Sequence, residues 1–361
     1  MRRTPQKFLS IFCALLACAV ICARPHAADA GKKLLPPEEG VYHAAHPDFG
    51  LRDDLVTKGR VRAFVRTAEK SIVWAYVSFH WDKGIEFPVK QCRVLNECGV
   101  VPLVGIMPWS TLEQGRAESV YTLERIVRGY FDEHLRQCAE DVKNLGFPVM
   151  IEFGPECNGS WFPWSAAWNG RGEDSYGERG WPDGPERFRD AYRHIVDVFR
   201  EAGAIDVTWV FHIASDGSPK SPKEGWNAAR WYYPGDDYVD WIGTSAYGRL
   251  RGDDPARSFA DTVKHVYPGL VALSETKPIA VLEMGVSEVP ALGDKGLWIR
   301  EAFAAIHEGR YPRLKAVAWW NKTYRPDGTR STLEIDSSVR ALRAYREGVA
   351  SMRDVAVFSD E

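Results

Sequence analysis

The run Pro278-Ile279-Ala280-Val281-Leu282-Glu283-Met284-Gly285 is short and apolar, and a carboxylate stands near its end. Its length and its β-branched residues indicate a buried β-strand. Seven further runs of this kind alternate along the chain with longer segments of helical periodicity. The eight predicted strands span residues 41–46, 72–80, 100–107, 148–153, 207–212, 239–245, 278–282 and 316–320.

Helical segments lie between most of these strands. The clearest of them span residues 121–145, 185–202, 254–273, 297–308 and 337–347. Eight strand–helix repeats favour an α/β fold of the closed (β/α)8 TIM-barrel type over an open doubly wound sheet. No glycine-rich phosphate loop follows the first strand, which disfavours a nucleotide-binding sheet. We therefore predict a single barrel domain over residues 31–361.

The first thirty residues have the pattern of an export signal. Basic residues within positions 1–7 precede an apolar run over 8–23, and Ala28-Asp29-Ala30 places small residues before Gly31. The run is short for a membrane span, and Cys18 fits a lipoprotein signal less well because apolar residues continue after it. We expect residues 1–30 to be removed, and we expect a secreted or periplasmic mature chain without a membrane span.

The composition excludes some partners and leaves other questions open. A net charge of -3 gives no reason to expect nucleic acid or an anionic membrane as a partner. The 14 tryptophans can pack in the core or stack on sugar rings, and we expect both uses. Cys92 or Cys98 could bridge to Cys138, or the thiols, with that of Cys157, could be buried and free. No Cys/His spacing typical of a metal site occurs, so no metal is expected.

Two glutamates stand where the chemistry of such barrels lies, just past the carboxyl ends of strands. Glu156 follows the fourth predicted strand among tryptophans, and an apolar surrounding raises the pKa of a carboxyl group. Glu283 is the only charge in its apolar run, and burying it is costly unless it is used. The alternatives are a solvated loop carboxylate for Glu156 and an internal ion pair for Glu283.

Two carboxyl groups that face each other across a sugar are what cleavage of a glycosidic bond needs. One protonates the leaving oxygen while the other attacks the anomeric carbon, and retaining enzymes place them about 5–5.5 Å apart. Because Glu156 and Glu283 are far apart in the sequence, only the fold can bring them together. They are the predicted catalytic pair.

Other side chains at the strand ends are candidates for binding a polysaccharide or oligosaccharide substrate. Tyr247 could donate a hydrogen bond to Glu283, or it could be an ordinary tyrosine of the barrel rim. Because side chains alternate along a strand, one indole of the pair at 319–320 should face the barrel mouth and the other the helices, and Trp320 is preferred as the sugar floor. Asn158 could orient a sugar hydroxyl or support the backbone. The remaining candidates are Trp161, Trp164, His80, Trp109 and His212.

The segment Glu156-Cys157-Asn158-Gly159-Ser160-Trp161-Phe162-Pro163-Trp164 resembles the acid/base motif of glycoside hydrolase family 26, the β-mannanase family. Segments at 209–211, 232–236, 238–243, 277–283 and 336–346 are similar to that family too, so the resemblance covers roughly residues 60–348. It implies a retaining, endo-acting glycosidase without cofactor, similar to mannan endo-β-1,4-mannosidases. Other members act on mixed-linkage β-glucans or β-1,3-xylans. It also implies that Glu156 is the acid/base, Glu283 the nucleophile and Tyr247 the partner of the nucleophile.

The chain departs from the family pattern around the expected sugar site. Pro155 stands where the family usually has His, Glu152 where it commonly has Arg, and His212-Ile213-Ala214 where it usually has Ser-Pro-Asn. If the strand alternates, Glu152 points the same way as Glu156 and, once buried, needs a partner or a proton. These departures keep an alternative function open, a non-catalytic glycan-binding protein on a degenerate hydrolase barrel.

Overall fold

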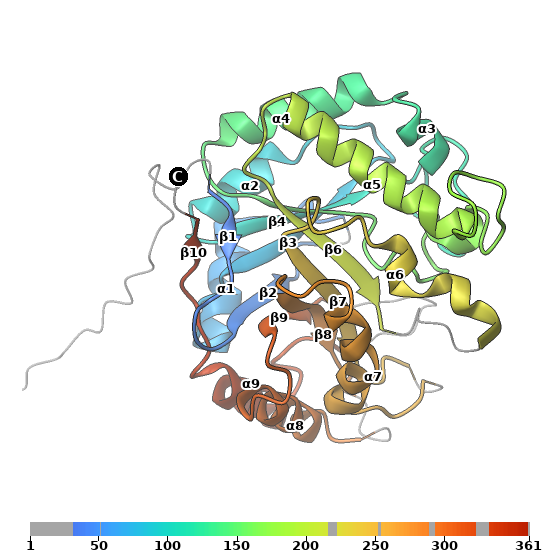
Figure 1. Cartoon of the computed structure of the whole chain (residues 1–361). Coiled ribbons are helices and arrows are strands. Elements are labelled where there is room, and N and C mark those ends of the chain that lie inside the picture. The colour runs from blue at the N-terminus through green and yellow to red at the C-terminus, as the bar shows by residue number, and fades with distance from the viewer. Residues whose placement is uncertain are drawn as a thin grey trace, which may run out of the picture.

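Eight parallel strands close a barrel in sequence order (Figure 1). The computed structural model describes residues 32–50, 52–215, 222–251, 254–288, 293–322 and 332–359, so the predicted signal at 1–30 lies outside the described residues. The barrel strands are β2 (Tyr42–Pro47), β3 (Trp74–His80), β4 (Val101–Met107), β5 (Met150–Phe153), β6 (Thr208–Ala214), β7 (Trp241–Tyr247), β8 (Ile279–Gly285) and β9 (Leu314–Asn321). The ring closes where β9 pairs with β2, and the prediction of a (β/α)8 TIM barrel is confirmed.

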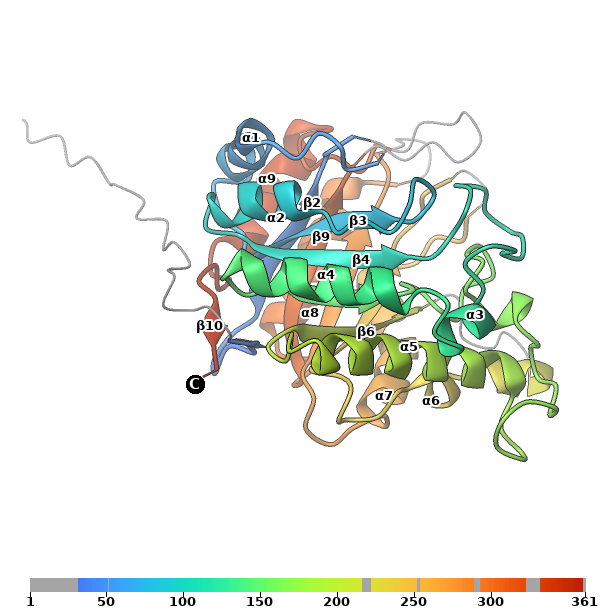
Figure 2. The same cartoon turned by 90° about the horizontal axis from the view of Figure 1, so that it is seen from above.

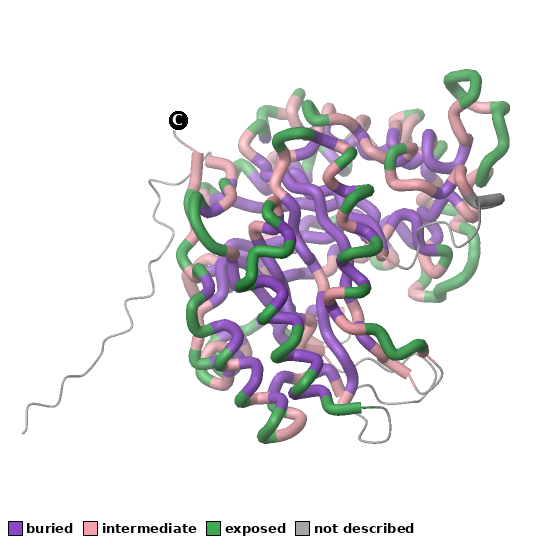
Figure 3. Tube along the Cα trace, turned by 60° about the horizontal axis from the view of Figure 1, so that its bottom comes forward, coloured by how far each residue is buried: buried purple, intermediate pink, exposed green. Residues whose placement is uncertain are grey.

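The helices surround the barrel, and the strands form its buried centre (Figure 3). They are α1 (Lys58–Ala68), α2 (Val89–Asn96), α3 (Leu123–Val127), α4 (Asp132–Leu145), α5 (Asp183–Glu201), α6 (Ala229–Tyr232), α7 (Phe259–Val271), α8 (Lys295–His307) and α9 (Val339–Val349), with 3-10 turns η2 (Ala166–Trp168) and η3 (Pro222–Asn227). Helix α5 shows why they pack this way, because Phe188, Tyr192, Ile195 and Phe199 recur at helical spacing and are all fully buried. None of the described helices has both the length and the apolar character needed to cross a membrane.

The predicted helix over 121–145 is two helices, and that prediction is wrong in this respect. Gly129 has a φ of +75°, outside the helical region, and its backbone N–H bonds to the carbonyl of Ile126. This ends α3 before α4 begins at Asp132. Helix α7 starts later than predicted because the Ser258 hydroxyl accepts a hydrogen bond from the backbone N–H of Asp261 and caps the helix there.

None of the four cysteines among the described residues forms a disulfide. Cys92 lies in α2 and Cys138 in α4, both buried, and Cys98 follows the end of α2. Of the two alternatives left open by the sequence, the structure shows buried free thiols for Cys92, Cys138 and Cys157.

The amino end of the barrel is filled by aromatic side chains. Tyr42, Trp74 and Trp241 pack together, and their ring centroids lie 6.0–6.4 Å apart. Because β3 and β7 are not neighbours in the barrel, Trp74 and Trp241 touch each other across its interior. Outside them, β1 (Leu34–Leu35) pairs with β10 (Val357–Phe358), and the Trp241 indole donates to the Leu34 carbonyl. Figure 2 shows β1 and β10 at the end of the strands opposite to α3. A functional site is therefore expected at the carboxyl end of the barrel.

Candidate active site

Glu283 lies at the carboxyl end of β8 and is the one residue of that strand that is only partly buried. The pairing of β7 with β8 shifts register between Thr244 and Ser245, so that Val281 lies opposite Thr244 and Glu283 opposite Ser245. Leu282 is the extra residue of this bulge, and bulges often re-aim a side chain next to an active site. The Tyr247 hydroxyl donates a hydrogen bond of 2.7 Å to Glu283 Oε2. The sequence predicted this pairing from the strand ends.

Glu156 lies in the loop that follows β5, in the left-handed conformation with a φ of +52°. This conformation costs a non-glycine residue about 1–2 kcal/mol, and such residues cluster at functional sites. The Trp161 indole N–H donates a 2.8 Å hydrogen bond to Glu156 Oε2. A side chain at Gly159 would collide with that indole, since a Cβ there would lie 2.3 Å from it. The loop is therefore shaped to bring Trp161 onto the carboxylate.

The two carboxyl groups influence each other electrostatically. Burial raises the pKa of Glu283, and the negative charge of Glu156 raises it further. Burial also raises the pKa of Glu156, while the positive charge of His212 and hydrogen bonds from Ser245 and Trp161 lower it. Because neighbouring like charges cannot both form easily, ionisation of one carboxyl group favours the protonated form of the other. One protonated and one ionised carboxyl group is the state that glycosidic cleavage requires.

Behind this pair lies a buried ion pair between Glu152 and His212. Glu152 is fully buried in β5, and its Oε2 lies 3.0 Å from His212 Nδ1. His212 Nε2 lies 2.9 Å from the Ser245 hydroxyl of β7. Burial lowers the pKa of His212, but the negative charges of Glu152, Glu283 and Glu156 and the hydrogen bond with Glu152 together outweigh it and raise the pKa to about 9. The partner that a buried Glu152 was predicted to need is therefore a charged histidine.

Three predicted substrate contacts are corrected by their burial. His212 is 2% exposed, Asn158 2% and Trp164 1%, so none can touch a sugar directly. Asn158 exchanges two hydrogen bonds with the backbone of Ala214 and ties the loop to β6, which is the supporting role considered for it. Trp164 donates to the Pro155 carbonyl and stacks on Phe162 at 4.4 Å. These residues hold the loop of Glu156 in place.

The two indoles at the end of β9 point in opposite directions, as strand alternation predicted. Trp319 packs on Tyr345 of α9 and donates to the carbonyl of Leu333. Trp320 is partly exposed and lies against His46 of β2, with ring centroids 4.0 Å apart. Trp320 is therefore the one that faces the barrel interior; its contact with a sugar stays a prediction.

His80 and Trp109 form a unit at the ends of β3 and β4. The Trp109 indole donates a 2.9 Å hydrogen bond to His80 Nδ1, and the two rings stack. Burial lowers the pKa of His80 to about 4, so the ring is neutral at pH 7. Since Nδ1 accepts, Nε2 carries the hydrogen. His80 and Trp161 are partly exposed, whereas Trp109 is 5% exposed and serves mainly to orient His80.

Sequence reasoning missed a second buried ion pair beside Trp320. His46 Nε2 and Lys322 Nζ each lie 3.2 Å from Asp53 Oδ1. His46 ends the first predicted strand, so the strand-end rule could have found it, but Asp53 and Lys322 carry no such signal. Ser245 was also missed, because a serine at the end of a strand is not distinctive.

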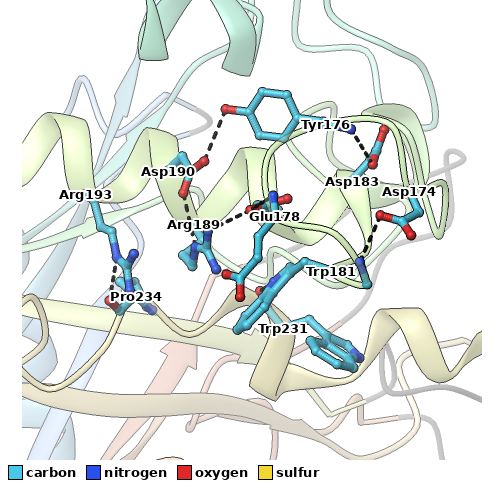
Figure 4. A network of polar contacts seen from close by, with 12 residues as sticks. Asp174, Tyr176, Glu178, Trp181, Asp183, Arg189, Asp190, Arg193, Trp231 and Pro234 are labelled. Carbon is cyan, nitrogen blue, oxygen red and sulfur yellow. Dashed lines mark hydrogen bonds and ion pairs between the residues drawn. The ribbon is translucent and has the colours of Figure 1, made fainter.

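The loop that carries Glu156 is fastened to α5 by a network of polar and aromatic contacts farther along it (Figure 4). Asp183 at the start of α5 accepts hydrogen bonds from the backbone N–H groups of Ser175 and Tyr176. The Arg189 guanidinium lies 4.5 Å from the ring centre of Trp181, whose indole donates to the carbonyl of Trp231. These contacts join the loop after β5 to α5 and α6.

No group of three or more His, Cys, Asp or Glu side chains in the described part of the chain is arranged to hold a metal ion. The groups that converge at the carboxyl end are carboxyl, imidazole, phenol and indole groups. They can donate and accept protons, offer a nucleophilic carboxylate and contact an apolar sugar face.

Comparison with known proteins agrees with this chemistry. Residues 118–290 match the model of glycosyl hydrolase family 26. The chain is 30% identical to endoglucanase H of Acetivibrio thermocellus over 298 residues, which is 82% of this chain and 29% of that protein. It is 27% identical over 184 residues to a mannan endo-1,4-beta-mannosidase of Bacillus subtilis, which is 50% of this chain and 41% of that protein. The chain thus spans less than half the length of each of these relatives.

Solved structures share the fold. The catalytic domain of a family 26 endo-β-1,4-mannanase from Bacillus sp. JAMB-750 superposes with a TM-score of 0.60 at 18% identity, covering 89% of this chain and 88% of that one. A family 26 β-mannanase from Bacteroides ovatus gives a TM-score of 0.59 at 16% identity, covering 87% of this chain and 89% of that one. At this level of identity the likeness concerns the barrel architecture.

Proposed function

We propose that this chain is a member of glycosyl hydrolase family 26 and a retaining glycoside hydrolase that cleaves a β-linked polysaccharide internally. One observation carries the proposal: at the carboxyl end of the barrel Glu156 lies near enough to Glu283 for its negative charge to raise the pKa of Glu283, although β6 and β7 separate their strands. Each is partly exposed and each has a hydrogen-bond donor of its own. A substrate can therefore reach both carboxyl groups.

The proposed reaction is a double displacement. Glu156 gives its proton to the glycosidic oxygen while a Glu283 oxygen bonds to the anomeric carbon and the C–O bond to the leaving sugar breaks. Glu156, now ionised, takes a proton from water, the water oxygen bonds to the anomeric carbon, and the bond to Glu283 breaks. The Tyr247 hydroxyl stabilises the ionised form of Glu283 before attack.

The substrate class we propose is β-mannan or a related β-glycan. Two relatives carry the printed names endoglucanase and mannan endo-1,4-beta-mannosidase, so both glucan and mannan need testing. Trp161, Trp320 and His80 are the partly exposed aromatic and imidazole groups that support contacts with sugar rings. Pro155 and Glu152, which depart from the family pattern, lie in the loop and strand next to the acid/base.

The experiment is a polysaccharide panel of mannan, glucomannan, lichenan and xylan, read by reducing ends and by product mass. We expect the wild type to release oligosaccharides from at least one of them, and Glu156→Ala and Glu283→Ala to release none. Glu308→Ala is the matched control, because this exposed glutamate follows α8 and pairs only with Arg310 among the described residues. Sugar binding without turnover by the wild type would instead favour the glycan-binding alternative.

We also propose that the protein acts outside the cytoplasm. The basic start, the apolar run over 8–23 and the small residues before Gly31 support this. The N-terminal peptide of the protein from the periplasm or the medium should begin at Gly31. A protein that stays in the cytoplasm with residues 1–30 intact would contradict export.

A further inference from the structure

We propose that Asp53 is a positioning residue that fixes the indole of Trp320 against the substrate. One oxygen of its carboxylate holds both supports of that indole, which are the ring packed against it and the backbone that carries it. Asp53 is 1% exposed, so it acts through Trp320 and does not touch substrate itself. This role rests on the proposed function, which places a sugar on Trp320, and it adds what holds the indole in place.

Asp53 lies buried in the loop after β2. Its backbone has a φ of +52°, a left-handed conformation that is unfavourable for a residue other than glycine and persists where the surrounding contacts impose it. A buried carboxylate also needs hydrogen bonds and a compensating charge. Asp53 receives them from three donors, which lie in β2, in β3 and directly after β9.

Two of the donors meet at the same oxygen. His46 Nε2 near the end of β2 and Lys322 Nζ directly after β9 each lie 3.2 Å from Asp53 Oδ1. A carboxylate only accepts hydrogen bonds, so Nε2 carries a hydrogen of the His46 ring. The Lys322 side chain is 13% exposed, and its charge compensates that of Asp53 in surroundings largely closed to water.

These two donors are also the supports of Trp320. The His46 ring lies against the Trp320 indole, with ring centroids 4.0 Å apart and an interplanar angle of 31°. It covers one face of the indole, which leaves the opposite face for a sugar. Lys322 follows Trp320 by two residues, so its bond to Asp53 anchors the backbone that carries the indole. Loss of the Asp53 carboxylate would release both supports together.

The second oxygen of Asp53 takes the place of a strand contact. β2 pairs with β3 only at Ala45 and Ala75, whereas β3 pairs with β4 along its whole length. Farther along β3, the Ser78 backbone N–H donates a 2.8 Å hydrogen bond to Asp53 Oδ2 rather than to a carbonyl of β2. Asp53 therefore stands where β2 and β3 separate, and it ties three neighbouring strands together at the carboxyl end.

Trp320 lies beside the strand end that carries the proposed nucleophile. A Cβ added to Gly285, two residues after Glu283, would lie 3.8 Å from the Trp320 carbonyl oxygen. A shift of the indole would therefore move a sugar relative to Glu283, and a displacement of about 1 Å can cost about 10²-fold in rate. The loss should appear mainly in kcat, because the indole surface remains while its alignment is lost.

The test is a double-mutant cycle between Asp53→Asn and Trp320→Ala, measured as kcat and KM on the substrate found with the panel. Asp53→Asn keeps the size of the side chain but removes its charge and one acceptor oxygen. We expect it to lower kcat/KM roughly 10- to 100-fold when Trp320 is present. In the Trp320→Ala background the loss should be less than about twofold. Equal losses in both backgrounds would overturn the role of Asp53, since it would then act independently of Trp320.

A second readout does not depend on hydrolysis. The NMR resonance of the Trp320 indole N–H, identified by its loss in Trp320→Phe, senses the His46 ring that packs against the indole. It should shift in Asp53→Asn and also in Lys322→Met, which removes only the support after β9 and replaces Asp53→Asn if that variant does not fold. A resonance that stays at the wild-type position in the folded variants would overturn the role of Asp53.

The control is Asp82→Asn. Asp82 follows β3 and is also a mostly buried carboxylate in an ion pair, but its partner is Arg52 at 2.6 Å. It should leave the Trp320 resonance unmoved, and a shift as large as that in Asp53→Asn would contradict a specific role of Asp53. A wild type that cleaves nothing, but whose Trp320 resonance moves in Asp53→Asn and not in Asp82→Asn, would overturn only the hydrolase proposal.

Discussion

The two ends of the barrel interior are filled in opposite ways. At the amino end, Tyr42, Trp74 and Trp241 pack together and are fully buried. At the carboxyl end, Glu152 and His212 are as deeply buried but carry ionisable groups that lie 3.0 Å apart. A single strand, β7, runs from one environment to the other. Burial alone therefore does not predict whether a side chain inside the barrel is apolar or ionisable.

The difference shows where stability and chemistry reside. Burying a large aromatic side chain is strongly favourable, since removing one typically costs about 3–5 kcal/mol. A buried ion pair often contributes little to stability because desolvation offsets the attraction. We therefore expect the amino end to stabilise the fold and the carboxyl end to provide activity, and we expect mutations to separate the two.

The largest effect is expected for Glu283→Ala at the carboxyl end. Loss of the nucleophile should lower kcat by more than about 10⁴-fold, as for other groups that form the covalent intermediate. The unfolding midpoint should not fall, because the variant loses a buried carboxylate whose pKa is raised by burial and by Glu156. Initial rates and thermal unfolding measure the two quantities. A large drop in stability would show that the two ends are not separable.

Trp241→Ala should do the reverse at the amino end. It opens a cavity beside Tyr42 and Trp74 and should lower the free energy of unfolding by about 3–5 kcal/mol in urea titrations. The kcat per folded molecule should stay near the wild-type value. Loss of activity with unchanged stability would contradict the assignment of stability to the amino end and of activity to the carboxyl end.

Tyr247→Phe should have an intermediate effect on catalysis. It removes the donor to Glu283, which raises the pKa of this carboxyl and disfavours its charged form. Since a hydrogen bond to a charged group contributes about 1.5–3 kcal/mol, kcat/KM should fall roughly 10- to 100-fold. The acidic limb of the pH profile should move up. A limb that stays or moves down would mean that Tyr247 does not support the ionised nucleophile.

The smallest effect at pH 7 is expected for His43→Gln, about 1 kcal/mol for the loss of a hydrogen bond. Burial lowers the pKa of His43 to about 4, so the folded state binds fewer protons there than the unfolded state. Wild-type stability should therefore fall as the pH drops from about 6.5 to about 4. In His43→Gln the free energy of unfolding should lack this part of the pH dependence. An unchanged slope between these pH values in urea titrations would contradict a neutral buried His43.

The strands and the positions of the proposed catalytic pair were predictable because each has a local signal. Apolar runs marked all eight barrel strands, and their ends pointed to Glu156, Glu283 and Tyr247. The break at Gly129 was not foreseen, since helical periodicity continues on both sides of it.

Which aromatic side chains are exposed and which are buried was not predictable in the same way. Trp161 and Trp164 lie three residues apart in one loop, yet one is partly exposed beside Glu156 and the other is buried on Phe162. Which of the two indoles is exposed depends on the space that Gly159 leaves for Trp161 and on packing against elements far away in the sequence.

The support behind the catalytic pair depends on the register of strands far apart in the sequence. Glu152 meets His212 because β5 and β6 are neighbours, and the bulge at Leu282 sets Glu283 opposite Ser245. Pairing register cannot be read from one strand alone.

The most direct test of the paired carboxyl groups is the configuration of the product when it first forms. Proton NMR of the anomeric signals in the first minutes of hydrolysis separates the two outcomes before mutarotation mixes them. Double displacement through Glu283 predicts that the β-anomer appears first. An α-anomer that appears first would mean direct attack by water, and Glu283 would not be the nucleophile.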